Sequence, residues 1–161
     1  MKHLTITLVL GALLLLLCSN CSFMDKMYAA QKIDDVATPL PFTTLENYFV
    51  RNDVDCSKTQ RLIFDNQRDF EEYFGMAATM GGRPTEVNWK KQYVVAVILP
   101  ETKRETAIRP VNVKATDNQC LVFSYDVKKG SKMSYTMVPF TAVAIDKPES
   151  ATKMTVFYLE K

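Results

Sequence analysis

Histidine and paired acidic side chains are the residue types in this chain that could carry out chemistry, and both are scarce or poorly spaced. The 161 residues include a single histidine, His3. It lies in a segment that we expect to be removed on export, which leaves the mature protein without an imidazole. Nucleophilic triads and dyads need a group that titrates near neutral pH, and His-ligated metal sites need its nitrogen. We therefore expect a protein that is not an enzyme.

The acidic residues form no pair suited to catalysis or to metal binding. Asp53 and Asp55 alternate like the first ligands of a calcium loop, but the later ligands and the glycine of such loops are missing. A solvated turn explains them better. Glu71 and Glu72 are adjacent on an expected helix and point in different directions, so they do not form an acid and base pair. We expect no metal and no cofactor.

The N-terminal residues predict export and a lipid anchor. Met1–His3 is a short basic start, and Ile6–Leu17 is an apolar run of the length typical of a secretory leader, too short to span a bilayer comfortably. A cysteine directly after such a run indicates lipoprotein processing. Cys21 is a better acylation site than Cys18, because no polar segment separates Cys18 from the apolar run.

The remaining cysteines leave two alternatives open. Cleavage before Cys21 would leave Cys56 and Cys120 as an even pair in an oxidising compartment. They either form a disulfide that closes a long loop and stabilises the domain, or remain two buried thiols.

The charge balance limits the classes of partner. The chain has 20 Lys and Arg against 18 Asp and Glu, a net charge of +2. A balance so near zero gives no electrostatic footprint for nucleic acid or for an anionic membrane surface. We expect no nucleic-acid partner, and contact with the outer membrane or cell surface through the lipid anchor only.

The sequence divides into three expected segments. We expect residues 1–20 to be a lipoprotein signal peptide and residues 21–42 to be the acylated N-terminus and a flexible tether, in which Pro39 and Pro41 favour extended backbone. Residues 43–161 are expected to form a single β-rich domain.

The expected domain is organised around Tyr93–Leu99, an unbroken apolar run that predicts a strand covered on both faces. Gln67 to about Met80 predicts a helix capped by Asn66, with an aromatic stripe that includes Phe70 and Phe74 facing the sheet. Further strands are expected at Tyr48–Val50, Arg61–Phe64, Val111–Ala115, Leu121–Val127, Met133–Met137, Ala142–Ile145 and Met154–Leu159, with a loop at Glu101–Glu105 and a turn at Lys128–Lys132. This is mainly β: a small β-sandwich or barrel of about eight short strands with one inserted α-helix.

Four stretches carry a resemblance to a known family. Val87–Val97 leads from polar and aromatic residues into the hydrophobic strand, Ile108–Val113 follows, Thr136–Val143 ends a strand in a Pro-aromatic pair, and Phe64–Phe70 leads into the helix. Together they resemble the C-terminal domain of the protease complex subunit PrcB family. The loop at Pro100–Ala107 departs from the glycine-rich turn of that family.

The resemblance implies a non-catalytic exported lipoprotein that binds a secreted or surface protease, as inhibitor or accessory subunit. A β-scaffold would offer loops or an edge strand to the protease. Each candidate contact is otherwise an ordinary solvated turn. The candidate contact residues are Thr102, Lys103, Arg104, Glu105, Lys129, Gly130 and Ser131.

A different class of function is the alternative: an envelope lipoprotein that binds a small molecule, lipid or glycan in a barrel mouth or sandwich groove. The aromatic residues that could line such a cavity also alternate like ordinary core residues. They are Trp89, Tyr93, Tyr125, Tyr135 and Tyr158.

Overall fold

The computed structural model describes residues 32, 37–77, 82–116, 120–147 and 154–161. The predicted leader and both acylation candidates, Cys18 and Cys21, lie outside these residues. The described elements are β1 (Thr38–Leu40), β2 (Phe42–Thr44), β3 (Tyr48–Val50), β4 (Gln60–Phe64), α3 (Gln67–Glu71), β5 (Phe74–Met76), β6 (Gln92–Ile98), β7 (Thr102–Ala115), β8 (Cys120–Met137), β9 (Phe140–Asp146) and β10 (Thr155–Glu160).

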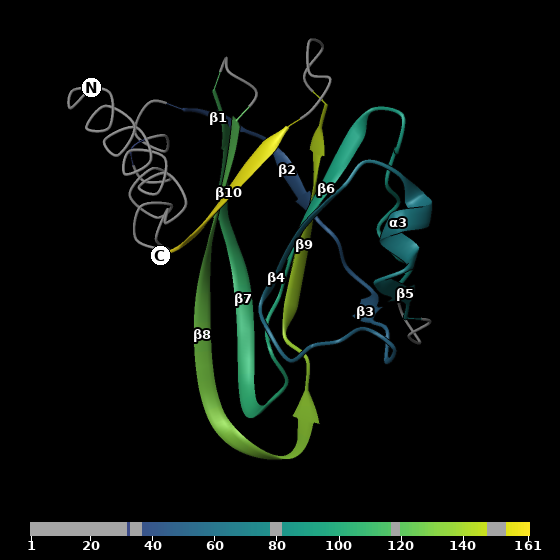
Figure 1. Ribbon diagram of the computed structural model, residues 1–161, viewed down its shortest axis with the longest axis vertical. Helices are drawn as coiled ribbons and strands as arrows, with labels where there is room; N and C mark the ends of the chain where they lie inside the picture. The colour runs from purple at the N-terminus through teal and green to yellow at the C-terminus, as the bar shows by residue number, and fades with distance from the viewer. Residues whose placement is uncertain (1–31, 33–36, 78–81, 117–119, 148–153) are drawn as a thin grey trace, which may run out of the picture.

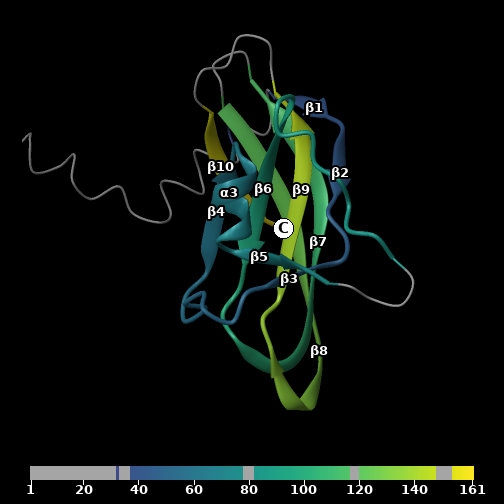
Figure 2. The same ribbon diagram turned by 90° about the vertical axis from the view of Figure 1, so that its right-hand side faces the viewer.

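These elements form three layers (Figures 1 and 2). The first sheet has the strand order β1-β7-β8-β10, and the second sheet has the order β2-β9-β6-β4. The helix α3 and the two-stranded sheet β3-β5 form an outer layer on the far side of the second sheet (Figure 1). The expected mainly-β sandwich is confirmed, and its sheets do not close into a barrel.

The strand β6 lies at the centre because its two faces serve two cores. Tyr93, Val95 and Val97 belong to the core between the two sheets. The alternate residues Val94 and Ala96 belong to the core beneath the outer layer. Alternate side chains of a strand point to opposite faces, so an apolar run without polar breaks is what such a position requires. The expectation of a strand covered on both faces is confirmed.

The helix is shorter than expected. Asn66 caps it as predicted, because its Oδ1 accepts a hydrogen bond from Asp69 N at 2.9 Å. The helix ends at Glu71, however, and Phe74–Met76 forms β5, which pairs with β3. The predicted helix over 67–80 is therefore wrong beyond Glu71 as far as Ala77, and 78–80 lie outside the described residues. Pairing with a distant strand overrides the helical spacing of the aromatic residues.

Two expected connections are strands instead. The charged loop that includes Thr102–Glu105 lies largely in β7, and the turn at Lys128–Lys132 lies in β8. Both expectations are wrong because the two polar segments pair with each other, with Arg104 opposite Lys132. The strands β7 and β8 consequently span 14 and 18 residues. The strands expected at Val111–Ala115 and Leu121–Val127 pair as an antiparallel hairpin. A proline at the start of a strand predicts either an edge or a bulge, and the register shifts beside Pro110.

The β-structure begins before the expected boundary. β1 pairs with β7 from Thr38, and β2 pairs with β9 from Phe42. Residues 38–42, which the sequence assigns to the tether, therefore contribute to both sheets. Among the described residues, none of the helical segments is long and apolar enough to cross a membrane.

Candidate functional site

The lower half of the β7–β8 hairpin brings together the residues expected to contact a partner. We call Thr102–Ala107 of β7 and Lys128–Met137 of β8 the ribbon. Thr106 lies opposite Lys129, and Thr102 lies opposite Met137. Among the described strands, β1 and β10 pair only with the upper parts of β7 and β8, so the ribbon strands pair only with each other. Figure 1 shows the two strands extending below the rest of the first sheet.

Side chains of β7 lie against the backbone of β8 within the ribbon. Arg104 Nη1 donates a hydrogen bond to Gly130 O at 3.3 Å. A Cβ placed on Gly130 would lie 2.7 Å from Glu105 Oε2, so the missing side chain lets Glu105 cross over the neighbouring strand. The two predicted contact segments therefore form one surface.

The ribbon is strongly basic. Five of its charged side chains are basic and one, Glu105, is acidic, and all six are exposed. Its net charge of +4 exceeds the net charge of +2 of the whole chain. The nearly balanced charge of the whole chain is therefore the sum of a ribbon with a net charge of +4 and a remainder with a net charge of −2. The basic residues are Lys103, Arg104, Lys128, Lys129 and Lys132.

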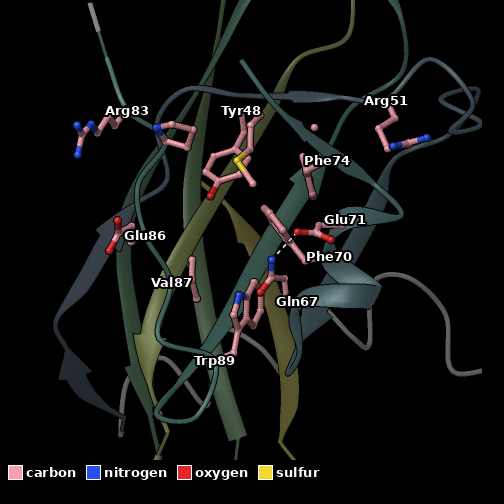
Figure 3. A pocket seen from close by; sticks show the side chains of 13 residues that line it. Tyr48, Arg51, Gln67, Phe70, Glu71, Phe74, Arg83, Glu86, Val87 and Trp89 are labelled. Carbon is pink, nitrogen blue, oxygen red and sulfur yellow. Dashed lines mark hydrogen bonds between the residues drawn. The ribbon is translucent and has the colours of Figure 1, made fainter. Parts of the chain in front are cut away.

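A second candidate site is an aromatic groove in the outer layer, with a volume of about 750 Å³. Phe70 and Phe74 form its floor, each only 2% exposed. The Tyr48 and Trp89 rings lie at opposite ends, with Phe70 between them (Figure 3). Their centroids are 5.3 and 5.4 Å from that of Phe70.

Hydrogen bonds fix the two ends of the groove. The Tyr48 hydroxyl donates to Thr85 O at 2.9 Å, which attaches β3 to the segment that forms the opposite wall. Lys147 Nζ donates to Trp89 O at 2.7 Å, which holds the backbone at the other end. The groove is therefore built from segments that lie far apart in the sequence.

Carboxylates occur on two walls of the groove. Glu71 lies on α3, where its Oε1 accepts a hydrogen bond from Gln67 Nε2 at 2.6 Å, and Glu86 lies on the opposite wall. Burial first, and then the charges of Glu71 and Glu86, raise the pKa of the Tyr48 hydroxyl above its ordinary value. Arg51 also lines the groove, but it is paired with Asp53 at 3.1 Å.

The aromatic residues that the sequence proposed for a cavity are mostly elsewhere. Only Trp89 lines the groove, since Tyr93 and Tyr125 lie in the core between the sheets, and Tyr135 is 63% exposed on the ribbon. The Tyr158 hydroxyl donates to Leu62 O at 2.6 Å, and burial raises the pKa of this hydroxyl. This hydrogen bond joins β10 to β4, the edge strands of the two sheets.

The structure also shows where the two cysteines and the acidic turn lie. Cys56 and Cys120 form no disulfide, because Cys56 is buried beneath the outer layer whereas Cys120 begins β8 in the first sheet. Burial raises the pKa of the Cys56 thiol, with smaller contributions from Glu101 and Asp55. Asp55 Oδ1 accepts a hydrogen bond from Ser57 N at 2.9 Å, which fits the expected solvated turn. In the described residues, no three His, Cys, Asp or Glu side chains gather to hold a metal.

Comparison with known proteins adds no relative: no family model, no curated protein and no solved structure matches this chain. The resemblance to the PrcB family remains a hypothesis based on the residues quoted above.

Proposed function

We propose that this chain is a non-catalytic, exported lipoprotein, anchored at the outer membrane or cell surface through acylated Cys21, that binds a secreted protease through the ribbon. It acts there as an inhibitor or an accessory subunit. The observation that supports this proposal is the ribbon itself. Two segments about 25 residues apart, each expected to contact a protease, lie on adjacent exposed strands.

The backbone of the ribbon supports binding by strand addition. Among the described strands, each ribbon strand pairs with its neighbour on one side only, so no further strand covers its outer edge. An extended segment of a partner can add to such an edge through main-chain hydrogen bonds, and side chains then supply specificity.

The charge of the ribbon restricts the partner. Lysines on an exposed edge discourage pairing with a second copy of the same basic strand. They favour an acidic segment, because opposite charges steer association and like charges oppose it. The protease surface that the ribbon binds is therefore acidic.

The proposal is tested by capturing peptidase activity. The protein, purified as its cell processes it, is immobilised and incubated with the secreted fraction of the same cells, and peptidase activity is measured in the eluate. Reversing three ribbon charges in the combined variant Lys128→Glu, Lys129→Glu and Lys132→Glu should reduce the captured activity at least about tenfold.

A matched control applies the same charge change elsewhere. Lys58, Lys90 and Lys91 are exposed and lie outside the ribbon. Their combined replacement by glutamate should leave the captured activity close to that of the original protein. The proposal fails if the original protein captures no peptidase activity, or if the two triple variants lose it equally.

A further inference from the structure

We propose that the aromatic groove binds an organic cation of the alkylammonium or alkylguanidinium class, with the cation over the rings and beside the Glu71 carboxylate. This inference makes specific the small-ligand alternative raised by the sequence. It does not depend on the ribbon, which lies on other elements.

The rings of the groove suit a cation. The faces of tryptophan, tyrosine and phenylalanine attract ammonium and guanidinium groups held within about 6 Å of the ring centroid, and tryptophan attracts them most. The Tyr48 and Trp89 rings lie on either side of the buried Phe70 ring, with centroids 5.3 and 5.4 Å from it. Tyr48 and Trp89 are partly exposed, so theirs are the rings that a cation can reach. A volume of about 750 Å³ is within the range of small-molecule sites, about 300–1,000 Å³.

The charges at the groove also favour a positively charged ligand. Figure 3 shows the Glu71 side chain directed toward the Phe70 ring and Gln67, whereas the Arg51 and Arg83 side chains lie at the margins and point away. Glu71 and Glu86 line opposite sides of the groove (Figure 3), and their charges, after burial, raise the pKa of the Tyr48 hydroxyl. An anion would meet these carboxylates, while a cation would form a charge-assisted hydrogen bond with Glu71.

Two sources could present this chemistry: a small free amine, or a lysine or arginine side chain of a peptide. The apolar part of either ligand would lie along Val87, which lines the side of the groove opposite α3 (Figure 3). The groove recognises the same cationic group in both cases, so the two sources are separated by affinity.

Trp89 is the only tryptophan of the chain, so its fluorescence reports on the groove directly. The purified protein is titrated with n-butylammonium and n-butylguanidinium, and in parallel with n-butyrate and butan-1-ol, which match the chain length without a positive charge. We expect a saturable change with the two cations and a much weaker response to the anion and the alcohol. A second arm uses acetyl-Gly-Lys-Gly-amide and acetyl-Gly-Glu-Gly-amide.

The peptide arm assigns the source. Tighter binding of the lysine peptide than of n-butylammonium supports a side chain of a peptide, and equal or weaker binding supports a free amine. Butyrate or butan-1-ol binding as well as n-butylammonium would overturn the inference, as would the absence of any saturable change.

Two variants identify the carboxylate. Glu71→Gln keeps an oxygen that can accept from Gln67 but removes the charge, and should weaken binding of n-butylammonium about tenfold. Glu72→Gln makes the same change at an exposed neighbour on the helix cap that does not line the groove, and should leave binding unchanged. Circular dichroism verifies that both variants are folded. Equal effects of the two substitutions would refute the role of Glu71.

Discussion

Replacing Phe70 with alanine tests whether the outer layer is packed on the second sheet as a true core. The Phe70 side chain is 2% exposed. Its ring contacts four aromatic rings at centroid distances between 4.8 and 5.5 Å. These partners are Tyr48, Phe64, Phe74 and Trp89, so the residue connects β3, β4, β5 and the segment before β6.

The expected loss of stability is large. Truncating a buried phenylalanine to alanine typically costs about 3–5 kcal/mol, because transfer energy is lost and a cavity remains. Each aromatic pair contributes about 0.5–1.5 kcal/mol beyond its buried area. Since these terms are not additive, we expect the free energy of unfolding to fall by about 4–5 kcal/mol for Phe70→Ala. Phe70→Leu, which retains most of the apolar volume, should cost about 1–2 kcal/mol.

Urea denaturation followed by Trp89 fluorescence and by far-UV circular dichroism measures this loss both locally and globally. The matched control is Phe49→Ala, because Phe49 lies on the neighbouring strand β3 but is 45% exposed. This control should lose about 1 kcal/mol or less. If Phe70→Ala costs no more than Phe49→Ala, the packing argument is wrong. If the two probes give different midpoints, the outer layer unfolds apart from the sandwich.

Two further predictions concern the helix cap and a buried hydroxyl. Asn66→Ala should lower the free energy of unfolding by about 1 kcal/mol, since it removes the acceptor of the hydrogen bond from Asp69 N. The control Asn52→Ala, in an exposed turn, should change the free energy of unfolding little. Equal losses in the two variants would contradict the capping role of Asn66. Tyr158→Phe should lower the free energy of unfolding at pH 7 by about 1–2 kcal/mol, because Leu62 O loses its donor. Burial raises the pKa of Tyr158 in the folded protein, so its contribution is complete below about pH 10, where the unfolded chain begins to ionise, and is lost as pH rises further. Stability measured from about pH 9 to 12 should therefore fall less steeply for Tyr158→Phe than for the original protein, and an unchanged slope would contradict this linkage.

Short sequence patterns are sufficient to predict the strands whose side chains are buried. The apolar run at Tyr93–Leu99 predicts a strand covered on both faces, because no polar residue marks either face as solvated. The alternation at Val111–Ala115 and at Leu121–Val127 likewise predicts two strands of a hairpin, and Pro110 predicts an edge or a bulge at the start of the first. In each case the information lies within a few residues of the feature.

The ribbon and the end of the helix could not be predicted in this way. Lys128–Lys132 has the composition of a turn, and its strand conformation depends on pairing with residues about 25 positions earlier. Phe70 and Phe74 have helical spacing, but Phe74 pairs through β5 with Val50. Propensity yields to such long-range pairing, because the pairing depends on residues that a local window does not include.

The groove was missed for a related reason. The sequence indicates Trp89 as a cavity residue, but its partners Tyr48 and Phe70 come from two other segments. The aromatic stripe of α3 indicated a buried face and could have suggested a common cluster. It carried no information on which part of that cluster stays open to a ligand.

The consecutive strands β1 and β2 have a mechanical consequence. Pro41 alone separates them, yet β1 adds to the first sheet and β2 to the second. Tension applied to the chain before Thr38 is therefore borne first by the three residues of β1. The load reaches the second sheet only after those residues have peeled away from β7, so the two layers yield in sequence rather than together.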